Sequence, residues 1–194
     1  MLSVQEGCDK FCSFCVVPYT RGVEISRPAK QILNEAQELI DIGAKEIILL
    51  GQNVNAWSQS NGKDTDMTFA QLINEISELN IERIRYITSH PRDMTEELMR
   101  AHRDIEKLQP YLHLPVQSGS DKILKEMNRN YSSQEYIDII DKTREYKQDI
   151  AISGDFIVGF PGETDDDFEA TLDIVKRVKY CLLYTSDAAD DGHS

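Results

Sequence analysis

The sequence predicts an α/β fold in which parallel strands alternate with helices. Short apolar runs of strand length recur along the chain, and stretches with helical apolar spacing separate them. Nearly every expected strand is followed by a polar or glycine-bearing cluster: EGCDKFC, GQN, SHP, QSGS and GFPGE. In barrels of parallel strands, the carboxyl ends of the strands gather one active site. Simple turns are the alternative interpretation of each cluster, but five at equivalent places favour a site.

Five strands are expected, each from a short run rich in aliphatic and β-branched residues. The run EIILL is the clearest of them, because it is continuous, apolar and closed by the polar cluster GQN. In order, the expected strands cover residues 2–5, 46–50, 84–88, 111–114 and 150–158.

Helices are expected where apolar residues recur three and four positions apart. Pro28 opens the first helix and Gly43 ends it. Thr164 caps the last helix, and Asp167 three residues later suits a capping box. A polar loop is expected to extend from the second strand through Asp66. The expected helices cover residues 28–43, 69–76, 94–108, 121–127, 133–146 and 164–178.

Composition indicates an ordinary soluble globular protein. The chain has 194 residues, 40% hydrophobic and 28% charged, and it lacks both an apolar run of the roughly 18 residues that span a bilayer and a secretory signal. A cytoplasmic location without membrane association is therefore expected. The net charge of -13 argues against sequence-blind binding of polyanions, although the residues around the first three cysteines are locally basic.

Cys8, Cys12 and Cys15 form a Cys-x3-Cys-x2-Cys pattern, one thiol short of a closed tetrahedral site. Thiolates suit zinc, copper(I) and iron–sulfur clusters. A structural zinc site usually has four protein ligands, and a ferredoxin-type electron carrier usually has four cysteines. A 4Fe–4S cluster with three cysteine ligands would keep one iron open for a small chelating molecule. On spacing alone, all three interpretations stay open.

The sequence blocks EGCDKFCSFCVVPYTRGVEISRP, LLGQNVNAW, TSHP, LHLPVQSGSDKILKEMNR and SGDFIVGFPGETDDDFEATL resemble the radical S-adenosylmethionine (SAM) methylthiotransferases. The similarity runs from about residue 2 to residue 178. Within that family, the wording of the cysteine block favours the branch that 2-methylthiolates N6-isopentenyl-adenosine next to the tRNA anticodon.

This resemblance implies a partial (βα) barrel of the radical SAM type and two cofactors. Cys8, Cys12 and Cys15 would hold a 4Fe–4S cluster, and SAM would chelate its open iron. One electron from the cluster would cleave SAM to a 5′-deoxyadenosyl radical. Arg21 and Arg27 are possible contacts to SAM or to substrate. The residues implied to bind SAM are Phe14, Gly51, Gln52, Asn53, Gln117, Ser118, Asp155 and Gly159.

The chain departs from the family pattern at both ends. We expect a radical SAM core at residues 1–180 that stops before its last strand, followed at 181–194 by a tail that resembles vector-derived sequence, so Cys181 is not expected to be a ligand. The family's N-terminal domain, with a second 4Fe–4S cluster, and its RNA-binding C-terminal domain are expected to be missing. This chain alone is then not expected to complete sulfur insertion.

Partners and alternatives follow from the same resemblance. tRNA is expected as the partner of the full-length enzyme, with flavodoxin or ferredoxin as the electron donor and a monomer as the oligomeric state. The mildest alternative is a sibling methylthiotransferase that acts on threonylcarbamoyl-adenosine in tRNA or on a ribosomal-protein aspartate. An iron–sulfur electron carrier and a zinc-binding module are the non-enzyme alternatives.

Overall fold

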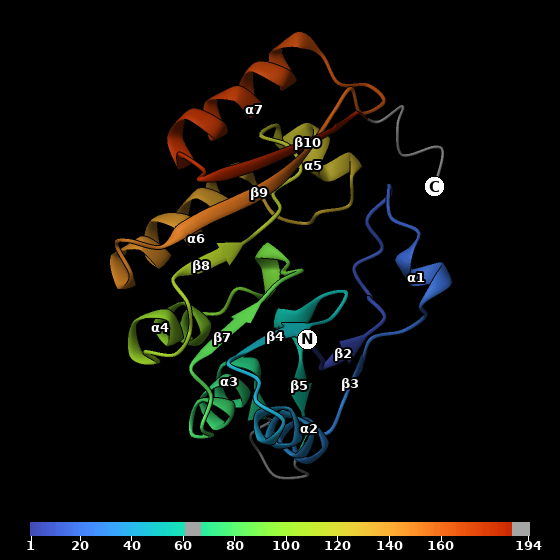
Figure 1. The fold of residues 1–194 in the computed structure, drawn as a ribbon. Coiled ribbons are helices and arrows are strands. Elements are labelled where there is room, and N and C mark those ends of the chain that lie inside the picture. The colour runs from blue at the N-terminus through green and yellow to red at the C-terminus, as the bar shows by residue number, and fades with distance from the viewer. Residues whose placement is uncertain (61–66, 188–194) are drawn as a thin grey trace. The chain divides into compact units, whose positions relative to one another are not determined.

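The computed structural model describes residues 1–60 and 67–187, and the chain forms two compact units. Unit 1 comprises residues 1–9 and 16–110, and unit 2 comprises residues 10–15 and 111–194. A three-stranded parallel sheet lies in each unit (Figure 1). The α/β class predicted from the sequence is confirmed.

Unit 1 has the strand order β1-β4-β7. Leu2 pairs with Leu49, and Ile47 pairs with Ile84; all four side chains are buried. The elements of unit 1 are β1 (Leu2–Ser3), β2 (Gln5–Glu6), α1 (Val17–Thr20), β3 (Ile25–Ser26), α2 (Ala29–Asp41), β4 (Glu46–Leu50), η1 (Val54–Ala56), β5 (Ser58–Gln59), β6 (Met67–Thr68), α3 (Phe69–Ser77), β7 (Arg83–Tyr86), η2 (Pro91–Asp93) and α4 (Glu96–Asp104).

Three sequence predictions for unit 1 need correction. The first expected strand divides, because β1 joins the parallel sheet whereas β2 pairs antiparallel with β3. The helix expected at 94–108 is shorter: the Thr95 side chain caps its start, and Ile105 has extended backbone angles that end it. The expected polar loop contains η1 and β5, and β5 pairs with β6, which begins just after the loop; its residues 61–66 lie outside the described residues.

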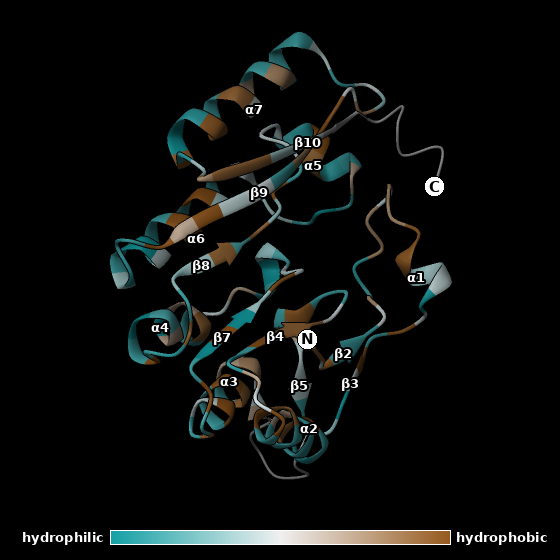
Figure 2. Cartoon of the chain, viewed as in Figure 1, coloured by the Kyte–Doolittle hydropathy of each residue, from teal (hydrophilic) through white to brown (hydrophobic). Residues whose placement is uncertain are grey.

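Unit 2 has the strand order β8-β9-β10, all parallel. Its helices are amphipathic: α7 shows apolar residues along one side and polar residues along the other (Figure 2), and Ile174 and Val178 are its buried apolar residues. The elements of unit 2 are β8 (Tyr111–His113), α5 (Asp121–Glu126), α6 (Ser133–Tyr146), β9 (Ala151–Val158), α7 (Asp165–Val178) and β10 (Leu182–Asp187).

The expectation that the core stops before its last strand is wrong. β10 lies within the segment expected to be an unstructured tail, and it pairs in parallel with β9 from Leu182 opposite Ser153 to Asp187 opposite Val158. The run LLYT supplies aliphatic, aromatic and β-branched residues that suit a strand. β10 therefore covers the edge of β9 that the sequence interpretation left open. The non-native origin of residues 181–194 stays a prediction.

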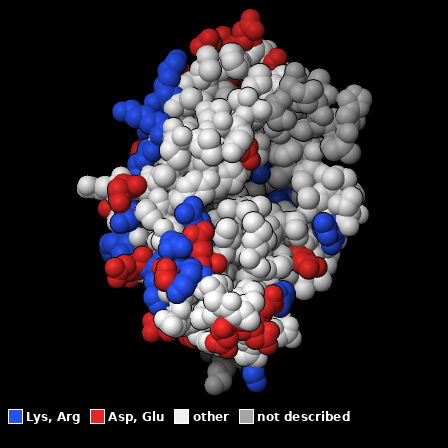
Figure 3. All heavy atoms as spheres, in the orientation of Figure 1, with Lys and Arg blue, Asp and Glu red and all other residues white. Residues whose placement is uncertain are grey.

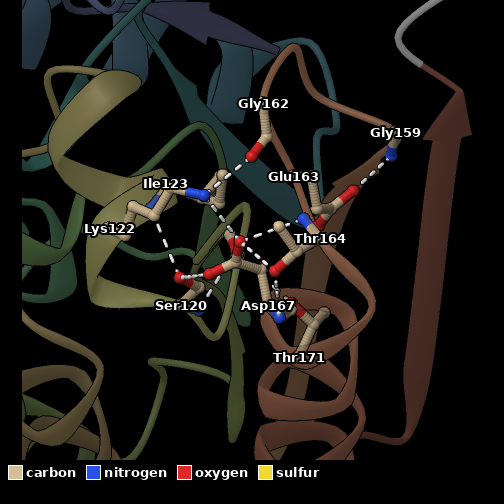
Figure 4. Close-up of polar contacts among 10 residues, drawn as sticks. Ser120, Lys122, Ile123, Gly159, Gly162, Glu163, Thr164, Asp167 and Thr171 are labelled. Carbon is tan, nitrogen blue, oxygen red and sulfur yellow. Dashed lines mark hydrogen bonds and ion pairs between the residues drawn. The ribbon is translucent and has the colours of Figure 1, made fainter.

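Asp167, in the first turn of α7, fixes the QSGS segment that follows β8 (Figure 4). Its carboxylate accepts hydrogen bonds from Ser120 Oγ (2.5 Å), Lys122 Nζ (2.9 Å) and Thr164 Oγ1 (2.7 Å). Two turns of α7 hold this segment, because Thr171 Oγ1 also accepts from the backbone N–H of Gly119 at 2.9 Å. The predicted capping box of Thr164 and Asp167 is confirmed.

Replacing Gly119 with alanine should destabilise the protein. A Cβ at this position would lie 2.3 Å from the carbonyl oxygen of Ala170. Because the atoms that it would meet belong to the backbone of α7, the helix must shift. Overpacking of this kind costs about 1–3 kcal/mol. Urea unfolding of the Gly119→Ala variant should show this loss, while the exposed Glu169→Ala variant in α7 should stay within about 0.5 kcal/mol of wild type. An unchanged midpoint for Gly119→Ala would show that the contact is not tight.

Replacing Asp167 with asparagine should destabilise the protein at neutral pH, and the difference should shrink in acid. Hydrogen bonds from Ser120, Lys122 and Thr164 hold the pKa of Asp167 well below its ordinary value. A carboxylate with a lowered pKa stabilises the folded state above its unfolded pKa of about 3.9, and this contribution is lost as the pH falls through the folded pKa. Urea unfolding of Asp167→Asn and wild type at pH 7 and pH 3 measures both differences. If wild type and Asp167→Asn differed equally in stability at pH 7 and pH 3, the stabilising role of the Asp167 charge would be contradicted.

Candidate functional site

The segment with Cys12 and Cys15 is held against the end of α5 in unit 2. The backbone N–H of Ser13 donates to the carbonyl of Met127 at 3.1 Å, and the Asn128 side chain donates to the carbonyl of Phe11 at 2.8 Å. Cys15 N–H donates to Cys12 O at 2.9 Å, which closes a turn between the two cysteines. The turn fixes the backbone from which both thiols project.

Phe14, the aromatic residue between these cysteines, is partly buried in unit 2. It lies against the buried cluster of Ile123, Met127 and Ile157, as does Phe160. Its ring therefore packs under the cysteine loop. The contact of Phe14 with SAM stays a prediction.

Arg129 is a buried cation beside Cys12. Its relative exposure is 5%, and that of Cys12 is 8%. The guanidinium donates to Cys12 Sγ at 3.5 Å, to the carbonyl of Pro115 at 2.7 Å and to the Tyr131 hydroxyl at 2.8 Å. Burial raises the pKa of Tyr131 to about 12, so this hydroxyl stays protonated at neutral pH and donates to the carbonyl of Val116. The sequence analysis did not identify Arg129.

The predicted SAM residues Gln117 and Ser118 lie between β8 and α5. Gln117 has a positive φ of 78°, and its backbone bridges β9 through bonds from its N–H to Asp155 O and from Ile157 N–H to its own carbonyl. Ser118 is fully buried, and its hydroxyl accepts from Ser120 N–H and lies 3.4 Å from Thr171 Oγ1. These bonds shape the loop; contacts of either side chain with SAM stay predictions.

Asp155 and Gly159 lie on and just after β9. Asp155 Oδ2 is 3.4 Å from His113 Nε2, and His113 Nδ1 is 2.8 Å from the Ser153 hydroxyl. The side chain of Asp155 is therefore held from the neighbouring strand β8. Gly159 has a positive φ of 75°, which suits glycine, and its N–H donates to the Glu163 carboxylate.

Gln5 organises the residues around Cys8 in unit 1. This buried side chain donates to Gly7 O at 2.7 Å and accepts from the backbone N–H groups of Gln52 (2.9 Å) and Asn53 (3.1 Å). The side chain of Gln52 adds a bond to the same segment, because its oxygen accepts from Gly7 N–H at 2.7 Å. The GQN cluster after β4 thus fixes the backbone immediately before Cys8.

Two glycines allow neighbouring segments to approach closely here. A Cβ on Gly51 would lie 2.5 Å from Gln5 Oε1, and one on Gly7, whose φ is +73°, would lie 2.0 Å from Val23 O. Asn53 is buried and donates to Asp93 Oδ2 at 2.8 Å, but its own Oδ1 has no hydrogen-bond partner within the described residues. A buried unsatisfied acceptor is costly, and a polar ligand that donates a hydrogen bond to Asn53 Oδ1 would offset this cost.

The two arginines predicted to contact SAM or substrate differ in burial. Arg27 is half-buried and already paired: it donates to Ser3 O and, at 2.6 Å, to Glu35 Oε2. Its carbonyl accepts from the indole N–H of Trp57, which is buried and packs as a core residue. Arg21 is exposed at the end of α1. Contacts of either arginine with SAM or with substrate stay predictions.

The chemistry of the three thiols suits a metal cluster. None of the four cysteines is in a disulfide, so all three thiols of the pattern are available as ligands. Cys8 belongs to unit 1, whereas Cys12 and Cys15 belong to unit 2. Within residues 1–60 and 67–187, no three His, Cys, Asp or Glu side chains are grouped as metal ligands. Convergence of the three thiols stays a prediction.

The surface charge and the hydropathy of the helices describe the rest of the molecule. On the face drawn in Figure 3, basic and acidic side chains lie next to one another mainly toward the left and the bottom of the view, and much of the remaining described surface is uncharged. None of the helices in the described part of the chain has the length and apolar character that crossing a bilayer requires.

Comparison with proteins named for their function gives strong similarity. The chain is 59% identical over 185 residues to the tRNA-2-methylthio-N(6)-dimethylallyladenosine synthase of Agrobacterium fabrum, covering 95% of this chain and 41% of that protein. The synthase of the same name from Ruegeria sp. is also 59% identical, with 42% of its length covered. The chain thus spans about two fifths of the length of these curated relatives.

Solved structures with low sequence identity share the fold. The radical SAM methyltransferase TsrM from Kitasatospora setae, with cobalamin and a 4Fe–4S cluster bound, superposes with a TM-score of 0.75 at 18% identity, over 96% of this chain and 36% of TsrM. Methylornithine synthase (PylB) gives a TM-score of 0.63 at 13% identity, over 96% and 52% of the two chains. The family model of the radical SAM superfamily matches residues 2–175, and this chain belongs to that superfamily.

Proposed function

We propose that this chain is the radical SAM core of a tRNA methylthiotransferase that acts on N6-isopentenyl-adenosine. The observation that carries the proposal is the 59% identity, over 95% of the chain, to proteins named as tRNA-2-methylthio-N(6)-dimethylallyladenosine synthases. The alternative is a sibling methylthiotransferase that acts on threonylcarbamoyl-adenosine in tRNA or on a ribosomal-protein aspartate.

Cys8, Cys12 and Cys15 would hold a 4Fe–4S cluster, and SAM would bind its open iron. When bound, this cluster supplies the one electron that cleaves SAM to methionine and a 5′-deoxyadenosyl radical. The chain's own residues position these groups. The backbone before Cys8 is fixed at Gly7, whose carbonyl accepts from the Gln5 side chain and whose N–H donates to Gln52 Oε1. The Ser13–Met127 bond fixes the backbone between Cys12 and Cys15.

SAM would be contacted by the segments that follow the strands. The unsatisfied Oδ1 of Asn53 supports a role for the GQN cluster, and the carboxylate of Asp155, held by His113, supports a role for the end of β9. Polar groups pre-positioned in this way lose little conformational entropy when a ligand binds. Phe14, Gln117, Ser118 and Gly159 are assigned to the same site from the resemblance.

The remaining parts of the reaction are assigned to the longer enzyme. A second 4Fe–4S cluster, a tRNA-binding surface and an electron donor such as flavodoxin or ferredoxin belong to this proposal, as do a monomeric state and a cytoplasmic location. The acidic charge of the chain offers little attraction for tRNA phosphates, so we expect the longer protein to supply most of the tRNA affinity.

Anaerobic reconstitution with iron and sulfide tests the proposal. We expect a brown protein with a broad charge-transfer absorption that changes when SAM is added, because SAM reaches the open iron. With dithionite, mass spectrometry should detect 5′-deoxyadenosine. The Cys12→Ala variant should lose the absorption and the product, and the matched Cys181→Ala variant, which removes an exposed thiol, should keep both.

The alternatives give different results in the same experiment. A zinc-binding module would yield a colourless protein with one bound zinc. A ferredoxin-type carrier would yield a brown protein whose spectrum does not respond to SAM. Either result would contradict the proposed function.

A further inference from the structure

Arg129 presents a charge without a carboxylate partner in the interior of unit 2. Lys and Arg are almost never buried unless they are paired, yet Arg129 is only 5% exposed. Its three hydrogen-bond partners are a carbonyl, a hydroxyl and the sulfur of Cys12. No Asp or Glu pairs with it in the part of the chain that the structure describes. Of these partners, Cys12 is the one that metal binding would make anionic.

The guanidinium is oriented toward this sulfur by its other two bonds. Pro115 O accepts from one terminal nitrogen at 2.7 Å, and the Tyr131 hydroxyl accepts from Nε at 2.8 Å, while the Tyr131 ring lies 5.3 Å from the guanidinium carbon. Tyr131 is fixed in turn by its bond to Val116 O at 2.8 Å. The remaining terminal nitrogen is thereby directed to Cys12 Sγ, 3.5 Å away.

We propose that Arg129 is a positioning residue that donates a hydrogen bond to the ligating sulfur of Cys12 and raises the reduction potential of the cluster bound there. The inference rests on the proposed function. Hydrogen bonds to cluster sulfurs and nearby charge are among the main determinants of iron–sulfur potentials. A reduced cluster carries one more negative charge than an oxidised one, so a cation fixed in a dry site favours the reduced form.

An anaerobic redox titration of the reconstituted chain with dithionite, followed by electron paramagnetic resonance, tests the inference. In Arg129→Met, which removes the charge and the donor, we expect the ratio of reduced to oxidised cluster at a fixed potential to fall about tenfold. This corresponds to a midpoint about 59 mV more negative for one electron. Arg129→Lys keeps the charge without the planar fork, so its midpoint should lie between those of Arg129→Met and wild type.

The control is Arg177→Gln, which removes an exposed arginine of α7 that bonds Gln134 and Asp141 and should leave the midpoint unchanged. An unchanged midpoint in Arg129→Met with wild-type iron content would overturn the inference. If Arg129→Met holds no iron, Arg129→Lys decides: a lowered midpoint supports the inference and a wild-type midpoint overturns it. Loss of the fold in both Arg129 variants, seen by circular dichroism, would also overturn it, because the guanidinium would then serve packing.

Failure of the proposed function looks different. In that case the wild-type chain itself assembles no cluster, and the inference falls with it. A wild-type cluster that responds to SAM, together with Arg129 variants of unchanged midpoint, would leave the proposed function standing and remove only the role of Arg129.

Discussion

Parallel strand pairing is the constraint on which the arrangement of both units depends. In a parallel sheet the carboxyl ends of neighbouring strands emerge at the same edge, so the segments that follow them become neighbours. In unit 1 this places the GQN cluster after β4 beside the Gly7 backbone that leads from β1 and β2 to Cys8. In unit 2 it places the QSGS segment after β8 against the end of β9. The polar clusters are positioned by strand pairing before any cofactor binds.

Buried polar side chains then refine these positions. Gln5 satisfies one carbonyl and two N–H groups around Gly7 and the GQN cluster, and Arg129 satisfies Pro115, Tyr131 and Cys12. Buried networks of this kind rigidify a site when they are satisfied and are costly when one member is lost. They explain how short, glycine-containing loops can hold the proposed cluster ligands in place without regular secondary structure.

The sequence was sufficient for features that depend on local patterns. The helix capped by Thr164, the EIILL strand and the cysteine spacing follow from periodicity and composition, and the structure confirms the first two. The sequence was not sufficient for features that depend on contacts between residues far apart in the chain. Arg129 and Gln5 are ordinary polar residues in the sequence, and only tertiary packing buries them beside the cysteines' loops. β10 was not predicted because its short run LLYT lies in a segment without clear strand periodicity, and pairing with β9 is what makes it a strand.

The central claim is that Cys8, Cys12 and Cys15 bind one cluster together, and cysteine alkylation followed by mass spectrometry tests it directly. The chain is labelled anaerobically before and after reconstitution, with the exposed Cys181 as the internal control. We expect the partly exposed Cys8 and Cys15 to react in the metal-free protein and to be protected together in the reconstituted protein, with the buried Cys12 unlabelled in the reconstituted protein and Cys181 labelled in both. Labelling of any one of the three in a protein with full iron content would contradict a three-cysteine cluster.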